Sequence, residues 1–321
     1  MSHTFSSDDT SHLPARCMDL AIRFHTCQQN TEKKQVVLAC HRKWCHSYGH
    51  CEPCAGVGDR TLHMLSLVQE ALQRCIPVKL DYPLTGIQLV SDAVYHDPLD
   101  PFLGNLLHRR SYDVTPRTVD VSSWGDEKAF VHFTPDHYGY IPYDMCLFHI
   151  LFRPVPILQQ EIDYHLGQMG TNNAIGIHFR SGDAASFGYD NKDVRATDIV
   201  DSFSKMLACG EKLAERLFPA EEHFTFFLAT DNAKAKALAR TVDDPRYSIY
   251  QTDIRPALYV SLDAERDAWM EVYLLSMMKG LVVNVRPKNY EGKAGRLSMF
   301  SVLSKRIGFI DDNDVMECHL D

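Results

Sequence analysis

The sequence lacks the features that would place it in a membrane or on a nucleic acid. No stretch reaches the roughly 18 consecutive apolar residues of a membrane-spanning helix, and residues 1–30 lack the charged start and apolar run of a signal peptide. The formal charge is −9, with both signs mixed along the chain, which argues against a broad basic face for nucleic acid. We expect a soluble chain that works either in the cytoplasm or in the Golgi or endoplasmic reticulum lumen, with any anchor outside this sequence.

Two common nucleotide fingerprints are also missing. The glycine turn Gly56–Arg60 (sequence GVGDR) has neither the third glycine of the dinucleotide-binding motif nor the Lys-Ser/Thr pair of a P-loop. No acidic residue is placed to take up a ribose, so a Rossmann dehydrogenase is disfavoured. Two glycines before a helix still let the backbone approach a ligand, and the start of a helix favours anions. The turn is therefore a weak candidate for an anion site.

What is present is the composition of a globular protein with more than one core. Apolar residues make up 45% and charged residues 23% of the 321 residues, which is ordinary for a folded chain, and a single core usually stops growing below this length. We expect a polar N-terminal arm (1–33), an N-terminal α/β domain (34–168) and a C-terminal α/β domain (169–321). The boundary is placed at a helix stop followed by a polar linker.

Hydrophobic periodicity predicts alternating strands and helices in the first half. A short apolar run at 35–40 indicates a buried strand, apolar residues at helical spacing predict a helix over 61–75, and a second strand follows at 76–80. Another strand is expected at 128–133, and 145–167 is a helical stretch interrupted by two prolines. Strand, glycine turn, helix and strand are the start of a parallel α/β layer.

The second half alternates more regularly. Strands are expected at 174–179, 224–229, 247–250 and 280–284, and helices at 198–217, 232–240, 268–278 and 295–307. This order predicts a doubly wound sheet, a fold that binds ligands just beyond the carboxyl ends of its strands. The fold class predicted for the chain is therefore α/β, with two Rossmann-like, doubly wound α/β domains facing across a cleft.

The ten cysteines do not settle the redox compartment. Four of them crowd into fifteen residues together with three histidines: Cys40, Cys45, Cys51, Cys54, His41, His46 and His50. One or two local disulfides, or free thiols in a loop, are one interpretation of this cluster. A zinc site or a redox-active CxxC pair is the other, although the spacing from Cys40 to Cys45 is longer than that of a usual zinc knuckle.

A charged motif leaves the first strand of the second half. The segment Ile177–Asp183 (IHFRSGD) delivers His178 and Arg180 to the end of the strand, two residues apart and so on the same face. The planar fork of an arginine can make two parallel bonds to a diphosphate. A buried Arg–Asp pair that fixes the loop, with no ligand, is an equally open interpretation.

The next strand also ends in a carboxylate. It runs into the sequence ATDN, in which Asp231 can accept hydrogen bonds from a ribose or a base. On local grounds the simpler interpretation is that Asp231 or Thr230 caps the helix expected from Asn232.

The order of these segments resembles that of the GDP-fucose-dependent fucosyltransferase superfamily. The segments are GVGDR, IHFRSGD, ATDN and the helix WMEVYLLS before the strand LVV. The first half is most similar to the plant xyloglucan, α1,6 and nodulation-factor branches, whose helix before the first motif resembles CLFHILFRPVP. The resemblance covers roughly residues 34 to 300. It implies a GT-B fold with an acceptor-side N-terminal domain and a C-terminal domain for the nucleotide-sugar.

The resemblance also implies roles for single residues. Arg180 would grip the β-phosphate of the donor and neutralise the leaving GDP, with His178 beside it. Asp231 matches an aspartate of the donor domain. Glu271 falls where the family usually has an aspartate that reads guanine, one methylene shorter. The remaining donor-binding candidates are Gly56, Gly58, Arg60, Asn289 and Tyr290.

One departure from the family concerns the donor. The family follows its last strand with a serine-rich, phosphate-binding turn, whereas this chain reads NVRPKNYEGKA, with Asn289 and Tyr290 in the places of Ser and Phe. Lys288 or Lys293 could supply the phosphate contacts instead. GDP-fucose is the expected donor, and another nucleotide-sugar is the alternative.

The mechanism that the resemblance implies is inverting and needs no divalent metal, because an arginine and helix starts replace it. Asp183 and Asp59 are the candidate general bases. The expected partners are a nucleotide-sugar donor and a glycan acceptor, without nucleic acid. A non-catalytic nucleotide- or carbohydrate-binding protein on the same fold is the rival interpretation.

Overall fold

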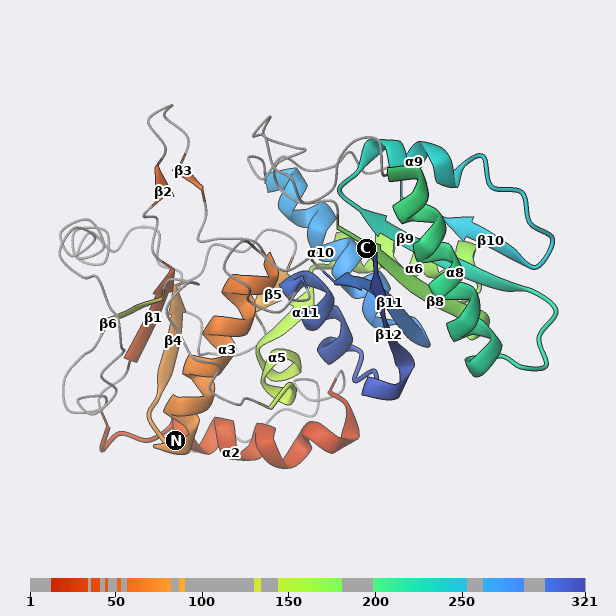
Figure 1. Ribbon diagram of the computed structural model, residues 1–321. Helices are drawn as coiled ribbons and strands as arrows, with labels where there is room; N and C mark the ends of the chain where they lie inside the picture. Colours follow the sequence, from red (N-terminus) through yellow and green to blue (C-terminus); the bar gives the residue numbers. More distant parts are fainter. Residues whose placement is uncertain are drawn as a thin grey trace. The chain divides into compact units, whose positions relative to one another are not determined.

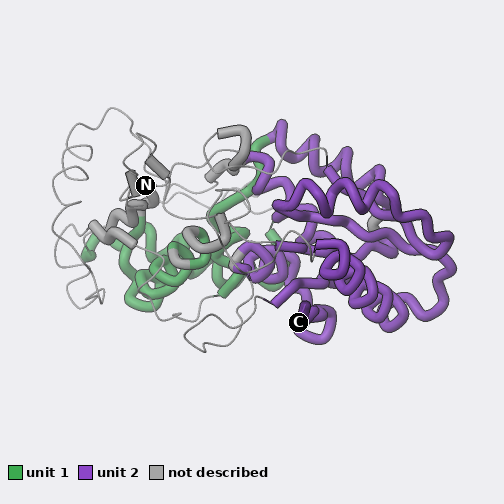
Figure 2. Tube along the Cα trace, turned by 45° about the horizontal axis from the view of Figure 1, so that its top comes forward, with its two compact units in different colours: residues 1–155 green, residues 156–321 purple. Residues whose placement is uncertain are grey.

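The computed structural model describes residues 13–33, 36–40, 44–45, 51–52, 57–81, 87–89, 130–133, 144–180, 199–252, 262–285 and 298–320. The chain divides into two compact units, Met1–Val155 and Pro156–Asp321 (Figure 2). Within the described residues, no helix combines the length and the apolar character needed to cross a membrane.

The first unit contains a parallel three-stranded sheet in the order β4-β1-β6 (Figure 1). β1 (Val36–Cys40) pairs in parallel with both β4 (Val78–Asp81) and β6 (Phe130–Phe133). Helix α3 (Val57–Gln73) lies between β1 and β4 in the chain and buries an apolar face that includes Leu65. The parallel α/β layer predicted for this half is therefore confirmed.

The other elements of the first unit are shorter. Two antiparallel pairs, β2–β3 and β5–β7, accompany the sheet. These elements are η1 (Ala15–Cys17), α2 (Met18–Gln28), β2 (Trp44–Cys45), β3 (Cys51–Glu52), β5 (Ile87–Leu89), α5 (Cys146–Leu151) and β7 (Phe152–Pro154).

Two long-range disulfides fasten the N-terminal segment to this unit. Cys17 bonds to Cys146 at the start of α5, and Cys27 bonds to Cys75 after α3. The sequence analysis assigned this segment to a polar arm. It instead forms η1 and α2, whose apolar side chains pack inward because the two disulfides hold the helix ends against α5 and α3.

The second unit is built on one five-stranded parallel sheet in the order β10-β9-β8-β11-β12. The chain enters at the central strand, moves outward through β9 to β10, and then crosses to the other side for β11 and β12. Its strands are β8 (Ala174–Phe179), β9 (Phe224–Thr230), β10 (Tyr247–Tyr250), β11 (Gly280–Val285) and β12 (Val315–His319). This is the doubly wound arrangement predicted from the sequence, and its direction reverses between β8 and β11.

Helices cover both faces of this sheet (Figure 1). Adjacent residues of β8 show the two layers, because Gly176 lies against Leu275 of α10 whereas Ile177 lies against Gly210 of α8. A side chain at Gly210 would also meet the ring of Phe226, so glycine lets α8 approach the sheet closely. The helices are α6 (Pro156–Met169), η2 (Thr171–Asn173), α8 (Ile199–Leu217), α9 (Ala233–Ala239), α10 (Leu262–Ser276), α11 (Met299–Ile307) and η3 (Asp312–Asp314).

Helix α6 belongs to the second unit, although the sequence analysis placed the boundary at its end. It packs on α10, and Glu161 of α6 pairs with Arg266 of α10 at 3.9 Å between Oε2 and Nε. A third disulfide, Cys209–Cys318, ties α8 to β12 within the same unit.

Candidate functional site

Polar side chains collect where the strands of the second sheet end. Arg180 directly follows β8, Asp231 follows β9 and Thr252 lies two residues beyond β10, while Asn284 is the last but one residue of β11. Since parallel strands present their carboxyl ends at one edge, these residues share the edge at which doubly wound sheets bind ligands.

The switch point of the sheet is fixed by one buried asparagine. Asn284 accepts a hydrogen bond at Oδ1 from the backbone N–H of Arg180 at 2.8 Å, and its Nδ2 donates to the carbonyl of Arg180 at 2.9 Å. Both bonds cross from β11 to the end of β8, where the strand order reverses. Asn284 is not among the residues predicted from the sequence, where its only signal is a polar residue at the end of the apolar strand GLVVN.

Arg180 and Asp231, two of the predicted donor-binding residues, lie together. The Nε of Arg180 is 3.5 Å from Oδ2 of Asp231, and the two side chains are only 13% and 18% exposed. From the sequence, Arg180 can either bind a ligand or form a buried pair with an aspartate. The pair exists, and its partner is the aspartate after β9.

The helix after β9 is capped by Asn232, which corrects the suggestion that Asp231 or Thr230 caps it. The Oδ1 of Asn232 accepts from the backbone N–H of Ala235 at 3.0 Å. The hydroxyl of Thr230 donates to the carbonyl of Phe179 at 2.6 Å and accepts from the N–H of Asn232 at 3.1 Å. With the cap made by Asn232, the carboxylate of Asp231 is directed to the arginine.

His178 is held inside the unit. Its ring is 5% exposed, shares a 2.5 Å hydrogen bond between Nδ1 and the Oγ of Ser301, and stacks on Phe300 with 4.9 Å between ring centroids. The histidine therefore anchors the first turn of α11 to the central strand. A direct contact of His178 with a donor stays a prediction.

Glu271 lies in a second polar cluster of this unit. Its Oε1 accepts a hydrogen bond from the hydroxyl of Thr252 at 3.1 Å and lies 3.7 Å from the Nζ of Lys236. Burial raises the pKa of the Glu271 carboxyl, and the negative charge of Asp267 on the same helix adds to that rise. The ammonium of Lys236 and the hydrogen bond from Thr252 partly oppose it.

A solved structure shares this fold. A mutant of Arabidopsis thaliana FUT1 in complex with GDP matches with a TM-score of 0.57 at 14% identity, over 98% of this chain and 79% of that one. NodZ α1,6-fucosyltransferase soaked with GDP-fucose matches with a TM-score of 0.49 at 14% identity, over 86% of this chain and 93% of that one. POFUT1 in complex with GDP matches with a TM-score of 0.47 at 10% identity, over 90% of this chain and 98% of that one. No protein-family model and no curated protein sequence matches. The chain therefore shares its α/β fold with FUT1.

Residues 57–60 of the glycine turn lie in a helix and not before one, which corrects the prediction made from the sequence. α3 begins at Val57, so Gly58, Asp59 and Arg60 form its first turn. Four other candidates lie outside the described residues: Gly56, Asp183, Asn289 and Tyr290.

The cysteine cluster is described only through its backbone. The register of β2 and β3 sets Cys45 directly opposite Cys51, and Cys54 lies outside the described residues. The choice between disulfide, thiol and metal for this cluster stays a prediction. In the part of the chain that the structure describes, no three His, Cys, Asp or Glu side chains are grouped to hold a metal ion.

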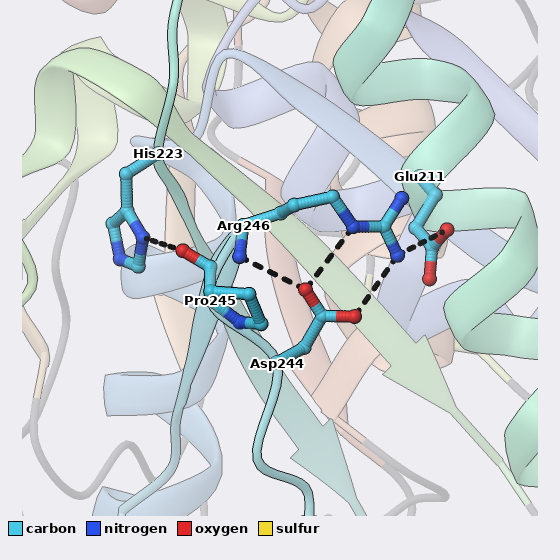
Figure 3. Close-up of polar contacts among 5 residues, drawn as sticks. All are labelled: Glu211, His223, Asp244, Pro245 and Arg246. Atoms are coloured by element: carbon cyan, nitrogen blue, oxygen red, sulfur yellow. Dashed lines mark hydrogen bonds and ion pairs between the residues drawn. The ribbon is translucent and has the colours of Figure 1, made fainter.

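The amino edge of the second sheet carries a different cluster (Figure 3). Arg246, just before β10, contacts Asp244 at 2.9 Å and Glu211 of α8 at 3.0 Å, each from Nη2. Nearby, a ring nitrogen of His223 lies 3.2 Å from the carbonyl oxygen of Pro245. This network joins α8 to the segment before β10, away from the edge where the strands end.

Proposed function

We propose that this chain is a glycosyltransferase that transfers fucose from GDP-fucose to a hydroxyl group of a glycan, with inversion at the anomeric carbon and without a divalent metal ion. The observation that carries the proposal is the position of Arg180 at the switch point of a doubly wound sheet, with its backbone fixed by Asn284 and its side chain by Asp231. Support comes from the motif order and from the fold shared with FUT1, a protein that was solved with GDP.

In this proposal Arg180 binds the diphosphate of the donor. Its guanidinium neutralises the charge that develops on GDP as the bond to the sugar breaks, a contribution that is usually the largest in such sites. Asp231 orients the guanidinium. His178 is proposed as a further donor contact, and the donor-binding roles of Gly56, Gly58 and Arg60 rest on the resemblance in sequence alone.

The reaction is a single displacement. The acceptor oxygen forms a bond to the anomeric carbon while the bond from that carbon to the β-phosphate oxygen breaks, and GDP leaves with the electron pair. The hydroxyl proton passes to a general base, for which Asp183 and Asp59 are the candidates.

A different donor is the second candidate function. Asn289 and Tyr290 stand where the fucosyltransferases have a serine-rich phosphate turn, so the contacts to the diphosphate differ from the family pattern. A transferase that uses another nucleotide-sugar, or a protein that binds one without catalysis, would retain the same fold.

The first test is the thermal stability of the purified protein with GDP, UDP, ADP or CMP, without added metal. A ligand at about 100 times its Kd stabilises the folded state by roughly 2.7 kcal/mol, which is an easily measured shift. A shift with GDP alone, followed by transfer from GDP-fucose to a glycan panel, is the expected result. A shift with UDP alone would be consistent with a glycosyltransferase but would exclude GDP-fucose as the donor. No shift with any nucleotide would contradict the proposal.

A further inference from the structure

Lys236 is a buried lysine that the proposed mechanism does not use. Its side chain is only 8% exposed, and lysines are rarely buried at this level unless they are paired. It lies in the first turns of α9, which follows the end of β9 that carries Asp231. The lysine is therefore close in sequence to the proposed donor site, and its charge is shielded from water.

Three elements hold this lysine in place. The cap by Asn232 fixes the start of α9, and the Nε2 of Gln251 donates to the carbonyl of Lys236 at 3.0 Å. The Nζ of Lys236 donates to the carbonyl of Thr252 at 3.4 Å and lies 3.7 Å from Oε1 of Glu271 in α10. The ammonium thus bridges the end of β10 and the helix that carries the proposed guanine-reading carboxylate.

The two oxygens of Glu271 have different surroundings. Thr252 and Lys236 both contact Oε1, and among the described residues no group donates a hydrogen bond to Oε2. A carboxylate with one oxygen fixed and the other available has a defined orientation and one acceptor to offer. Guanine presents an adjacent ring N–H and amino group that can donate to such an acceptor.

We propose that Lys236 is a positioning residue that keeps the Glu271 carboxylate charged and aimed so that it accepts the N–H donors of a guanine base. This inference rests on the proposed function, in which the donor is a GDP-sugar. Lys236 does not itself contact the nucleotide, and all of its effect on binding passes through Glu271.

A purely structural ion pair makes a different prediction. Removing one partner of a buried pair destabilises any protein, because the other charge stays buried and uncompensated. Such a loss would weaken every ligand alike and would not depend on the base or on the titration of the carboxyl group. Base selectivity and pH dependence therefore separate the two roles.

The test measures the Kd of GDP and of UDP between pH 6 and pH 8.5 for the wild type and the variants Lys236→Met, Lys236→Arg and Glu271→Gln. UDP shares the diphosphate but not the donors of guanine. The exposed neighbour Lys234 provides the matched control, Lys234→Met, because it lies on the same helix. Thermal melting confirms that each variant is folded.

Glu271→Gln is expected to raise the Kd of GDP roughly ten- to hundredfold, since a hydrogen bond to a charged group is lost. The Kd of UDP should be unchanged. Without the ammonium, the pKa of Glu271 rises further, so Lys236→Met binds GDP weakly at pH 6 and recovers as the pH rises. Lys236→Arg and Lys234→Met should retain the pH profile of the wild type.

The double variant Lys236→Met/Glu271→Gln covers the case in which Lys236→Met alone does not fold. If the lysine acts through the glutamate, the double variant binds GDP no more weakly than Glu271→Gln, whereas independent effects would add. Added effects, or an equal loss of GDP and UDP at every pH, would overturn the positioning role while leaving GDP binding by the wild type intact. A wild type that does not bind GDP would overturn the proposed function together with this inference.

Discussion

The two edges of the second sheet each pair an arginine with carboxylates but differ in how far that arginine is exposed to water. At the carboxyl edge, the partners Arg180 and Asp231 are 13% and 18% exposed. At the amino edge, Arg246 is 54% exposed beside Asp244 and Glu211 (Figure 3). Desolvating a charged pair is costly and often adds nothing to stability, so a buried pair at the edge where doubly wound sheets bind ligands is a candidate for a functional role.

The amino-edge network has the properties of ordinary surface ion pairs and requires no ligand to account for it. Hydrogen bonds to Asp244 raise the pKa of Arg246, and the same hydrogen bonds lower the pKa of the Asp244 carboxyl. Both groups remain charged at neutral pH and face water, where ion pairs contribute little and are screened by salt. The following variants test this contrast between the edges, from the largest expected effect to the smallest.

Replacing the arginine of the carboxyl edge should have the largest effect. Arg180→Ala is expected to lower the rate of transfer by about 10²- to 10³-fold, because the leaving diphosphate loses a charged donor. It should also lower the melting temperature, because the buried carboxylate of Asp231 loses its partner, so transfer is measured well below that temperature. Transfer from GDP-fucose and thermal melting measure the two quantities. Near wild-type activity in a folded Arg180→Ala protein would place the donor site elsewhere.

Removing the Cys209–Cys318 disulfide separates stability from binding. The bond joins residues 109 positions apart, and cross-links of this kind typically contribute about 2–4 kcal/mol. The Cys209→Ala/Cys318→Ala variant should unfold at a lower urea concentration and bind GDP normally well below its melting temperature. Loss of GDP binding in the folded variant would show that the disulfide also shapes the carboxyl edge.

Asn284→Ala should affect both stability and activity. It removes both hydrogen bonds to the backbone of Arg180, and leaving such groups unsatisfied costs about 1–3 kcal/mol each when they are buried. Chemical denaturation and transfer assays should both report a loss, with a smaller one for Asn284→Asp, which retains the acceptor. A loss of stability with unchanged transfer would limit Asn284 to the fold.

Replacing both Lys236 and Glu271 by apolar residues should leave the free energy of unfolding unchanged or raise it by about 1–4 kcal/mol, as with other buried ion pairs. The variant is Lys236→Met/Glu271→Leu, and it should lose the thermal shift with GDP. Burial raises the pKa of Glu271 above its ordinary value of 4.5, so the wild type loses stability as the pH rises from 4.5 through that higher pKa. Urea unfolding should show that the stability of the variant relative to the wild type increases as the pH rises over this range. A difference in stability that does not change with pH would contradict the raised pKa of Glu271.

The smallest effect is expected at the amino edge. Arg246→Ala removes the contacts to Asp244 and Glu211 but exposes no buried group, so melting should fall slightly at low salt and hardly at all at high salt. GDP binding and transfer should equal those of the wild type. A large loss of activity would mean that the amino edge also contributes to function, which would contradict the proposed difference between the two edges.

The order and type of most elements follow from hydrophobic pattern, and two strands have the predicted bounds, β8 at 174–179 and β10 at 247–250. Helix α2 was missed because its buried face is short and its attachment depends on distant cysteines. β12 (Val315–His319) was missed because only one of its five residues is fully buried, as expected for an edge strand.

The cysteines show the same limit. Spacing singles out the four between Cys40 and Cys54, yet the other six form disulfides between segments 48 to 129 residues apart. Disulfides of this number and span are typical of proteins that fold in oxidising compartments. Of the two compartments that the sequence leaves open, they favour the lumen of the endoplasmic reticulum or Golgi.

By itself the sequence determined that the chain is α/β, that its second half is doubly wound, and that charged residues follow the strands. These are consequences of local periodicity, which a single segment carries. Only the tertiary structure decided that Arg180 meets Asp231 and Asn284, and that Glu271 meets Lys236 and Thr252. Those pairings depend on strand order and helix packing, which bring together residues as far as 104 positions apart.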